Sequence, residues 1–366
     1  MRVLAWPARR NAARNPYQKL LYDAMEAETG TKVIEFGRKT MFARPAPDIL
    51  HIHWPDVFLA AGKGWKFWPR YFFLRLLFLV AGLRGTRVVW TAHNLRRTGQ
   101  RNAARLERYF WPWFLARIDG VIFMTEASAE VALESEPALA GKPITVAPHG
   151  HYKPVIAPFP AYHADTPDAG LPRILFFGSV TRYKNANEVL RAFLEMPRGS
   201  AELRICGEMS RTIPDTRLTE MLAGLGPEWD GLVTFREAFL PEDELVAAIR
   251  AADLVVFPYS DVLNSGAAIF ALSAGRPMLC SDNRLFQELQ AAAGTDWVRL
   301  IRAPLDGAQM AQVLAEVRRM RQAGHAPDLS AFDWDRIALD TVSFYQRVSG
   351  SADSADRDTP SSLRQE

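Results

Sequence analysis

The sequence predicts an α/β protein built from two doubly wound domains, and three observations support this. The chain has 366 residues, too long for one ordinary α/β core and suited to two domains of about 150–200 residues. Short apolar runs rich in β-branched residues alternate with helical patterns in both halves, which is typical of parallel sheets. Residues 153–171 carry four prolines and few periodic apolar positions, as expected of an interdomain linker.

Composition and charge narrow the class of protein. The chain is 48% hydrophobic and 23% charged, an ordinary globular balance. Residues 1–150 hold 22 Lys and Arg against 12 Asp and Glu, a net of +10, and residues 151–366 hold 22 against 29, a net of −7. The basic half is therefore expected to meet an anionic substrate or surface. A membrane is the favoured surface; nucleic acid is disfavoured because the basic residues are interleaved with apolar runs.

The cellular compartment follows from two weaker features. Cys206 and Cys280 are the two cysteines, without metal-binding spacing and each beside a predicted buried strand, which favours a reducing, cytoplasmic compartment. The apolar run at residues 2–6 is too short for a signal peptide and is expected to be the first strand. We expect a cytoplasmic protein, with peripheral attachment to the inner face of the cell membrane as an extension of that expectation.

The first domain is expected to span residues 1–152. Its predicted strands lie at residues 2–6, 31–36, 48–53, 87–91, 120–125 and 144–147, and its predicted helices at 16–28, 101–116 and from 126 onwards. The basic loop at residues 7–15 either faces a ligand at the strand ends or is a solvated loop. Ligands of doubly wound sheets bind beyond the carboxyl ends of the strands.

Polar residues follow the predicted strands of this half. They are His53, Asp56, His93, Glu126 and His149. In a parallel sheet these residues come to one edge, so they are candidates for binding or catalysis. His51 and His53 lie on the same strand, and we expect them to point to opposite faces or to reach different neighbours rather than to hold a metal ion together.

The most apolar segment is residues 65–83, WKFWPRYFFLRLLFLVAGL. Its uninterrupted apolar run, residues 76–83, falls short of the ~20 residues that span a bilayer. Aromatic, leucine and arginine residues together suit a helix lying at a membrane surface. The alternative is an ordinary buried helix of the α/β domain.

The second domain is expected at residues 172–332. Its predicted strands are at 173–177, around 204–206, 233–237, 254–258 and from 278, with helices at 186–195, 241–251 and 266–273. A last helix is predicted at 333–348 and a disordered tail at 349–366. The Asp333-Trp334-Asp335 triplet opens that helix and is interpreted as capping rather than metal binding.

Two loops of the second half have the chemistry of a diphosphate site. Asn264, Ser265 and Gly266 fall at a predicted helix start, where unpaired N–H groups and the helix dipole favour an anion. Gly178 and Ser179 end a strand, and Arg182 and Lys184 follow before the next helix. Two cations there can neutralise a diphosphate.

These loops carry a family resemblance. FFGSVTRYKN (residues 176–185) and PYSDVLNSGAAIFALSAGRPML (residues 258–279) resemble the donor-binding domain of GT-B glycosyltransferases, and the resemblance extends over nearly the whole chain. It implies two Rossmann-like domains with a cleft between them, the first binding the acceptor and the second a nucleotide sugar. It implies no metal ion and no cofactor beyond that donor substrate, and it places Gly207 and Glu237 in loops bordering the base and ribose.

One departure refines the resemblance. Retaining family 4 members usually carry two glutamates eight residues apart, where this chain has Val262 and Phe270. The HIHWP, TAHN, PHGHY and NSG segments are similar to xanthan-type exopolysaccharide β-mannosyltransferases. That similarity implies inverting transfer, with GDP-mannose as a candidate donor and a lipid-linked saccharide or other glycan as acceptor. The candidate bases are Asp56, His53, His93 and Glu126. A retaining family-4-like transferase and a non-catalytic sugar-nucleotide-binding module remain alternatives.

Overall fold

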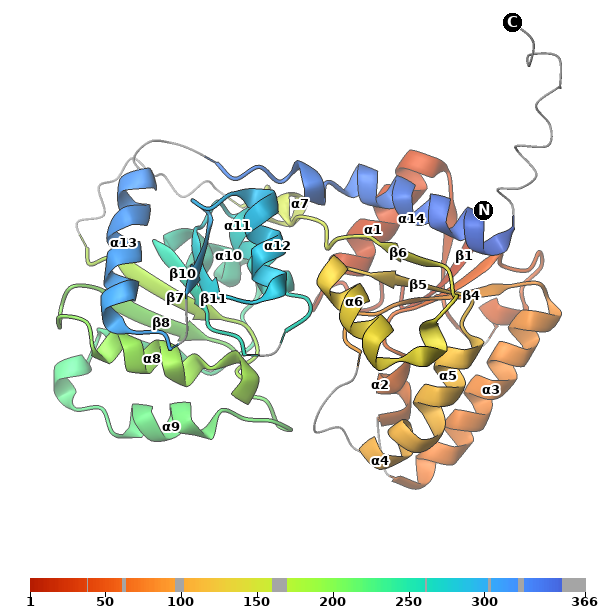
Figure 1. Ribbon diagram of the computed structural model, residues 1–366, viewed down its shortest axis with the longest axis horizontal. Coiled ribbons are helices and arrows are strands. Elements are labelled where there is room, and N and C mark those ends of the chain that lie inside the picture. Colours follow the sequence, from red (N-terminus) through yellow and green to blue (C-terminus); the bar gives the residue numbers. More distant parts are fainter. Residues whose placement is uncertain are drawn as a thin grey trace, which may run out of the picture. The chain divides into compact units, whose positions relative to one another are not determined.

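A computed structural model of the protein describes residues 1–37, 39–60, 64–95, 102–159, 170–260, 262–301, 304–321 and 326–350. The chain forms two compact units. The first contains Met1–Gly150 and Phe332–Glu366, and the second contains His151–Ala331. Each unit is an α/β layer structure around its own sheet (Figure 1).

The first unit is built on a six-stranded parallel sheet. Its strands are β1 (Arg2–Trp6), β2 (Lys32–Glu35), β3 (Ile49–Ile52), β4 (Arg87–Thr91), β5 (Gly120–Phe123) and β6 (Ile144–Val146). The order is β2-β1-β3-β4-β5-β6, and all pairs are parallel. The strands predicted in this half are confirmed to within two residues. The strand order reverses direction between β1 and β3, which is the place where open α/β sheets bind ligands.

Helices cover both faces of this sheet (Figure 1). They are α1 (Tyr17–Thr29), α2 (Pro55–Ala60), α3 (Phe67–Leu83), α4 (Ala103–Arg105), α5 (Trp111–Arg117), α6 (Glu126–Ser135) and α14 (Trp334–Ser349), with short turns η1 (Thr40–Phe42), η2 (Gly64–Lys66), η4 (Pro137–Leu139) and η7 (Ser330–Phe332). Successive strand residues point to opposite faces of the sheet, so their side chains belong to two separate hydrophobic cores. One core packs on α3 and α5, the other on α1 and α14.

The last helix of the chain completes the first unit. The surface on which α14 packs includes two glycines, where a side chain would clash. A Cβ on Gly120 would lie 2.8 Å from Phe344, and one on Gly150 would lie 2.3 Å from the Trp334 ring. Asp333 is the residue before the helix, but its carboxylate makes no capping hydrogen bond. The capping role expected for Asp333 is therefore wrong, although the helix itself is confirmed at residues 334–349.

The helix predicted at residues 101–116 is interrupted. It consists of α4, a π-helical turn η3 (Leu106–Phe110) and α5, and residue 101 lies outside the described residues. Pro112 lacks an N–H group and cannot donate to the carbonyl four residues earlier. A π turn just before it is one way to accommodate that missing bond.

The second unit repeats the plan in another order. Its strands are β7 (Arg173–Phe177), β8 (Glu202–Cys206), β9 (Val233–Arg236), β10 (Leu254–Phe257), β11 (Met278–Ser281) and β12 (Val298–Ile301). The parallel order is β12-β11-β10-β7-β8-β9, the dinucleotide-binding arrangement when β7 is counted as the first strand. Its switch point lies between β7 and β10, the two strands followed by the predicted diphosphate loops.

The helices of the second unit are α7 (Lys153–Ile156), α8 (Ala186–Leu194), α9 (Thr216–Ala223), α10 (Glu242–Ala251), α11 (Gly266–Ser273), α12 (Arg284–Ala293) and α13 (Gly307–Arg321), with the turns η5 (Arg182–Lys184) and η6 (Pro227–Trp229). The sequence did not predict β12, α9, α12 or α13. The region expected as a linker begins with α7, and its residues 160–169 lie outside the described residues. Residues 351–366, expected as a disordered tail, do so as well.

Candidate active site

The carboxyl ends of β3 and β4 bring two of the predicted histidines together. His53 Nδ1 lies 2.9 Å from His93 Nε2. His53 is buried and His93 is partly exposed. The Trp54 ring stacks on His93 at 4.5 Å between centroids. The site is at the edge where the strand order reverses, as expected for a ligand site.

His51 belongs to the same hydrogen-bonded group, which corrects the expectation that it faces away from His53. The two rings lie 4.3 Å apart, and the Tyr22 hydroxyl lies 2.7 Å from both His51 Nδ1 and His53 Nε2. The reason is the strand period: residues two apart share a face. His51 also contacts Thr91 Oγ1 through Nε2 and the Tyr345 hydroxyl through Nδ1, each at 2.7 Å.

Burial disfavours the charged forms of His51, His53 and His149. It lowers the pKa of His51 to about 3 and that of His149 to about 4. The pKa of His53 is held well below 6.5 by burial and by the neighbouring His51 and His93. The role of His53 as a candidate base stays a prediction, and burial disfavours its charged form because an imidazolium there would lose its water without gaining a counter-ion.

An aromatic shell surrounds the histidines. The Tyr17 ring of α1 lies 5.2 Å from His93, 4.7 Å from His149 and 5.6 Å from Trp334 between centroids. His149 Nδ1 contacts the Gly150 carbonyl at 2.9 Å. Tyr17 therefore links the ends of β4 and β6 to the start of α14, with His149 as part of the packing.

The two candidate carboxylates differ in setting. Asp56 lies in the first turn of α2, directly after β3, and is buried. Glu126 is the first residue of α6, after the Thr125 cap that exchanges hydrogen bonds with Ser128, and it is exposed. Both carboxylates suit the positive end of a helix dipole. Asp56 shares the β3 end with His53, whereas Glu126 follows β5.

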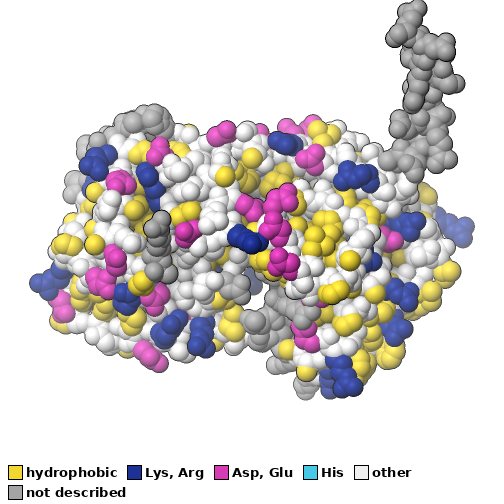
Figure 2. All heavy atoms as spheres, in the orientation of Figure 1, with side chains coloured by type: hydrophobic (Ala, Val, Ile, Leu, Met, Phe, Trp, Pro, Cys, Tyr) yellow, Lys and Arg dark blue, Asp and Glu magenta, His cyan; other side chains and the backbone are white. Residues whose placement is uncertain are grey.

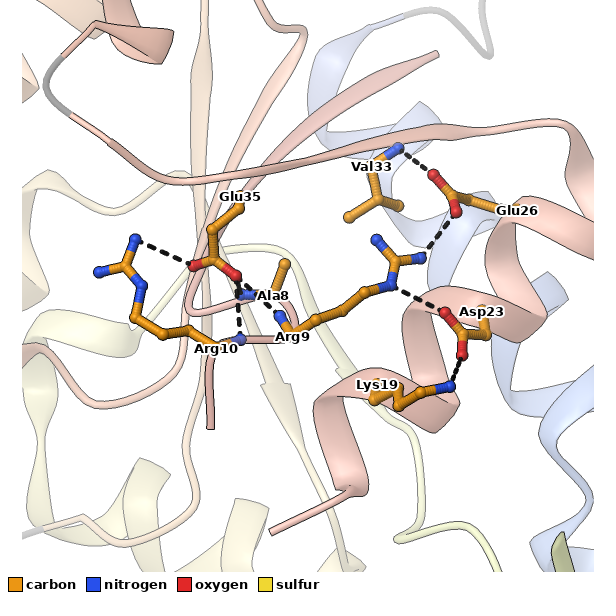
Figure 3. A network of polar contacts seen from close by, with 8 residues as sticks. All are labelled: Ala8, Arg9, Arg10, Lys19, Asp23, Glu26, Val33 and Glu35. Carbon is orange, nitrogen blue, oxygen red and sulfur yellow. Dashed lines mark hydrogen bonds and ion pairs between the residues drawn. The ribbon is translucent and has the colours of Figure 1, made fainter. Parts of the chain in front are cut away.

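The basic loop after β1 is neutralised within the unit (Figure 3). Three successive amides, of Ala8, Arg9 and Arg10, donate to Glu35 Oε2 at 3.1, 2.8 and 3.1 Å. The Arg9 guanidinium pairs with Asp23 and Glu26 at 2.8 and 2.7 Å. Neither expected role, ligand contact or solvated loop, describes Arg9, because its charge holds α1 to the loop.

In the second unit, the ends of β7 and β8 run side by side without room for side chains. Gly178 has φ +112° and Gly207 has φ +153°, and a Cβ on Gly207 would lie 1.8 Å from the Gly178 carbonyl oxygen. The pairing continues beyond the strands, since Val180 N donates to Glu208 O at 2.9 Å. Glycine is therefore required at position 207 for the close backbone approach and is favoured at position 178 by its positive φ.

Lys184 lies at the junction of the two predicted diphosphate loops. Its Nζ is 5.2 Å from the centre of the Tyr259 ring, and a Cβ on Gly178 would be 3.4 Å from that Nζ. Ser260 N donates to Tyr183 O at 2.9 Å, and Asn185 Nδ2 to Pro258 O at 2.8 Å, which tie the loop after β7 to the loop after β10. Burial lowers the pKa of Lys184 to about 8.

The start of α11 has the expected form. Ser265 is the N-cap and its Oγ accepts from Ala268 N at 3.2 Å. Asn264 and Gly266 flank it, partly exposed. Phe270, one of the two positions where a retaining relative would have glutamate, is buried against Tyr152 at 4.7 Å between ring centroids, so that position serves apolar packing.

The remaining candidates of this unit are dispersed. Ser179 and Arg182 are exposed in the loop after β7. Glu237 is also exposed, but it follows the edge strand β9, two strands away from β7. The structure thus gathers Gly178, Lys184 and Gly207, and it does not bring Glu237 to them.

Sequence reasoning missed four side chains of the first-unit cluster, namely Tyr17, Tyr22, Thr91 and Tyr345. Tyr17 and Tyr22 lie on the buried face of α1, with Gln18, Leu21 and Met25. A helical face that carries tyrosines next to strand-end histidines was the available signal. No sequence signal pointed to Tyr345, because no local sequence pattern predicts that α14 packs against this sheet.

Comparisons with known proteins fit this geometry. Residues 171–318 match the Glycosyl transferases group 1 family. A GDP-mannose:glycolipid 4-beta-D-mannosyltransferase of Xanthomonas campestris pv. campestris is 29% identical over 327 residues, covering 89% of this chain and 86% of that protein. The chain is a glycosyltransferase, with a group 1 domain over residues 171–318.

Solved glycosyltransferases share the fold. A sucrose-phosphate synthase from Thermosynechococcus elongatus superposes with a TM-score of 0.60 at 18% identity, over 96% of this chain and 99% of that one. Anabaena HepE, solved in complex with UDP, gives 0.56 at 12% identity, over 96% and 99%. The two doubly wound sheets of this glycosyltransferase are thus the GT-B pair that the sequence predicted.

Among the described residues of the glycosyltransferase, no helix is long and apolar enough to cross a membrane. No group of three or more His, Cys, Asp or Glu side chains in those residues is arranged to hold a metal ion.

Proposed function

We propose that this glycosyltransferase transfers mannose from GDP-mannose to a lipid-linked saccharide in exopolysaccharide biosynthesis, with inversion and without a metal ion. The observation that carries the proposal is the 29% identity to a GDP-mannose:glycolipid mannosyltransferase along 89% of this chain. A likeness that extends through both units concerns the acceptor half as well as the donor half.

The second unit supplies the groups for the donor diphosphate. Lys184 and the amides at the start of α11 lie beside the switch point of the sheet. Negative charge grows on the departing diphosphate as the sugar bond breaks, and fixed positive groups stabilise that charge. Arg182, exposed on the same loop, adds a second cation, and Ser179 and Glu237 remain proposed donor contacts.

Inversion is supported by side-chain chemistry. Val262 and Phe270 stand where retaining relatives carry glutamates, and the Phe270 ring packs against the Tyr152 ring. GDP-mannose carries an α bond, so a β product requires inversion and a base on the acceptor side. His93 is the preferred candidate, because His53 is buried and Asp56 lies in the helix turn beyond it.

The test is an assay with matched donors. Purified protein is supplied with GDP-mannose, UDP-glucose or GDP-fucose and a synthetic lipid diphosphate saccharide, and the product anomer is read by NMR. We expect transfer from GDP-mannose with a β linkage. An α linkage would support the retaining alternative, and transfer only from another donor would refute the donor assignment.

We also propose that the first unit docks on the anionic membrane that holds the lipid-linked acceptor. One face of α3 is core, through Phe67, Tyr71, Leu74, Leu77 and Ala81. The opposite face carries Phe72, Leu76, Leu79 and Leu83, each 56–79% exposed. This spacing of three and four residues makes one apolar stripe, so α3 combines both expectations, buried helix and exposed apolar surface.

Cations flank the stripe. Lys66 and Arg75 are exposed, with their charged ends over the Trp65 and Tyr71 rings at 5.5 and 5.8 Å. Figure 2 shows hydrophobic side chains interspersed with Lys and Arg along the edge where Figure 1 places α3. Interfacial helices bind a membrane by inserting apolar side chains below the headgroups and by electrostatic attraction of Lys and Arg to anionic lipids.

Vesicle sedimentation tests the docking. We expect the protein to sediment with phosphatidylglycerol vesicles at low salt, where attraction is least screened, and Leu76→Gln with Leu79→Gln to weaken binding about tenfold or more. Leu339→Gln is the matched control, since Leu339 is 49% exposed on α14. Equal binding by all three proteins, or no sedimentation of the wild type, would defeat the proposal.

A further inference from the structure

The turn that carries Lys184 is held by residues 258–260, which follow β10. The first of these residues accepts a hydrogen bond from Asn185 Nδ2 at 2.8 Å, and the amide and hydroxyl of the third donate to Tyr183 O at 2.9 and 3.1 Å. Both chain neighbours of Lys184 are thus tied to the loop after β10. The middle residue, Tyr259, contacts the lysine itself, with Nζ over its ring at 5.2 Å from the ring centre.

The Lys184 ammonium has this ring as a neighbour but no carboxylate. Within the described residues no Asp or Glu side chain forms an ion pair with it, and burial lowers the pKa of Lys184 to about 8 without an offset from a nearby charge. Loss of water disfavours the charged form of a lysine. An aromatic face within about 6 Å attracts a cation, and the attraction grows when water is excluded. The Tyr259 ring therefore favours the charge that burial disfavours.

The position of the Tyr259 ring is fixed by the core of the second unit. Tyr259 is 1% exposed and packs against the rings of Phe176, Phe257 and Phe286 at 6.4, 5.2 and 6.1 Å between centroids. Its hydroxyl has no hydrogen-bond partner among the described residues, although buried tyrosine hydroxyls usually have one. The aromatic ring is thus the part of Tyr259 that makes a specific contact.

We propose that Tyr259 is a positioning residue for donor binding, whose ring holds the Lys184 ammonium beside Gly178, where it can contact the diphosphate. The inference rests on the proposed function. A carboxylate could also hold the ammonium, but a diphosphate would then have to replace it. A ring attracts the cation more weakly, so it keeps the ammonium in place without competing strongly for it. Since Tyr259 is buried and Lys184 is partly exposed, the tyrosine acts through the lysine.

Two substitutions of Tyr259 separate its ring from its hydroxyl. Tyr259→Phe keeps the aromatic face and removes only the hydroxyl, whereas Tyr259→Leu removes the face. We expect the Kd for inorganic pyrophosphate and for GDP, measured by calorimetry, to rise about tenfold in Tyr259→Leu and to stay within about twofold of wild type in Tyr259→Phe. Phe286→Leu is the matched control and should leave both affinities unchanged, because it removes a buried ring next to Tyr259 but not the contact with Lys184.

A double variant distinguishes positioning from general damage to the fold. If Tyr259 acts only through the ammonium, Tyr259→Leu combined with Lys184→Ala should bind pyrophosphate no more weakly than Lys184→Ala alone. Additive losses would overturn the inference. So would a Phe286→Leu effect as large as that of Tyr259→Leu, or a Tyr259→Phe variant that binds as weakly as Tyr259→Leu.

Fluorinated rings decide the question if Tyr259→Leu does not fold. Phenylalanines of increasing fluorination, incorporated at position 259, keep the shape of the ring and progressively weaken the negative charge of its face. We expect pyrophosphate affinity to fall with each added fluorine, and equal affinities along the series would overturn the inference. Because pyrophosphate contains neither guanosine nor mannose, failure of the mannosyl-transfer assay leaves this result readable, and failure of the ring series leaves the donor assignment standing.

Discussion

The switch points of the two sheets are built from opposite chemistry. In the first unit, three histidines and two tyrosines are joined by short hydrogen bonds, and burial keeps the pKa of His51 and His53 far below neutrality. In the second unit, glycine backbones approach each other and one ammonium, that of Lys184, stands beside an aromatic ring. Uncharged imidazoles and hydroxyls can exchange hydrogen bonds with a sugar hydroxyl, whereas an ammonium can attract an anion. In the proposed function the first unit activates the acceptor and the second stabilises the leaving group, so mutations should separate the two roles.

Replacing His93 should produce the largest effect of any single change. We expect His93→Gln to lower kcat about 10²-fold or more, the scale of losing a general base. The Kd for GDP-mannose should stay nearly unchanged, since the donor groups lie in the second unit. Parallel variants Asp56→Asn and Glu126→Gln, measured by steady-state kinetics and calorimetry, sharpen the comparison. If either of them alone abolishes turnover while His93→Gln does not, the base is that carboxylate.

Removing the ammonium of the second unit should weaken the donor instead. Lys184→Ala deletes a charge-assisted contact of about 1.5–3 kcal/mol, which corresponds to roughly 10–150-fold in affinity for GDP. Arg198→Ala, an exposed cation of the same unit, is the control and should change nothing. If calorimetry finds equal GDP affinity for the wild type and Lys184→Ala, the diphosphate does not bind at Lys184.

The glycine contact offers a test of the backbone part of the donor site. Gly207→Ala forces a Cβ against the Gly178 carbonyl, and we expect a loss of about 1–3 kcal/mol in unfolding free energy. Gly199→Ala is the matched change: φ is +77°, but nothing lies within 4 Å of the new Cβ, so only backbone strain of about 1 kcal/mol applies. Equal denaturation midpoints would contradict the close approach of β7 and β8.

The smallest effect concerns pH. The pKa of Lys184 is lowered by burial to about 8, and in the proposed function its protonated form binds the diphosphate. Donor affinity should therefore be constant below pH 8, as far as this group decides it, and should fall by up to about tenfold per unit above it. The stability of the fold has the opposite pH dependence. Because the pKa of Lys184 is higher in the unfolded chain, 10.5, than in the folded protein, the unfolding free energy should rise between pH 8 and 10.5. Lys184→Met should abolish both trends, and their persistence would assign them to another group.

The local parts of this fold were readable from sequence. An apolar β-branched run marked β10, and α11 was marked by the polar segment before Gly266 and by the stop signals Gly275 and Pro277 after its end. Polar residues after strands located His53 and His93 because parallel strands end at one edge.

The features that the sequence did not predict depend on tertiary contacts. The sharing of Tyr22 by two histidines depends on the rotation of α1 above the sheet, and Tyr345 arrives from almost 300 residues away in the sequence. The depressed pKa values arise from burial, which sequence does not give residue by residue. The neutralisation of Arg9 by Asp23 and Glu26 likewise needed the fold, since charge counts alone suggested a ligand-binding loop.

The return of α14 to the first unit has a consequence for synthesis. A ribosome delivers residues 1–150 first, but the helix that covers Gly120 and Gly150 and carries Tyr345 is translated only after the whole second unit. During that interval the nascent first unit has one uncovered face, lined by the apolar residues that α14 later buries. Exposed apolar surface of this kind invites aggregation or chaperone binding. The unit that begins the chain is thus the last to be finished, and the second unit can close its core before the first does.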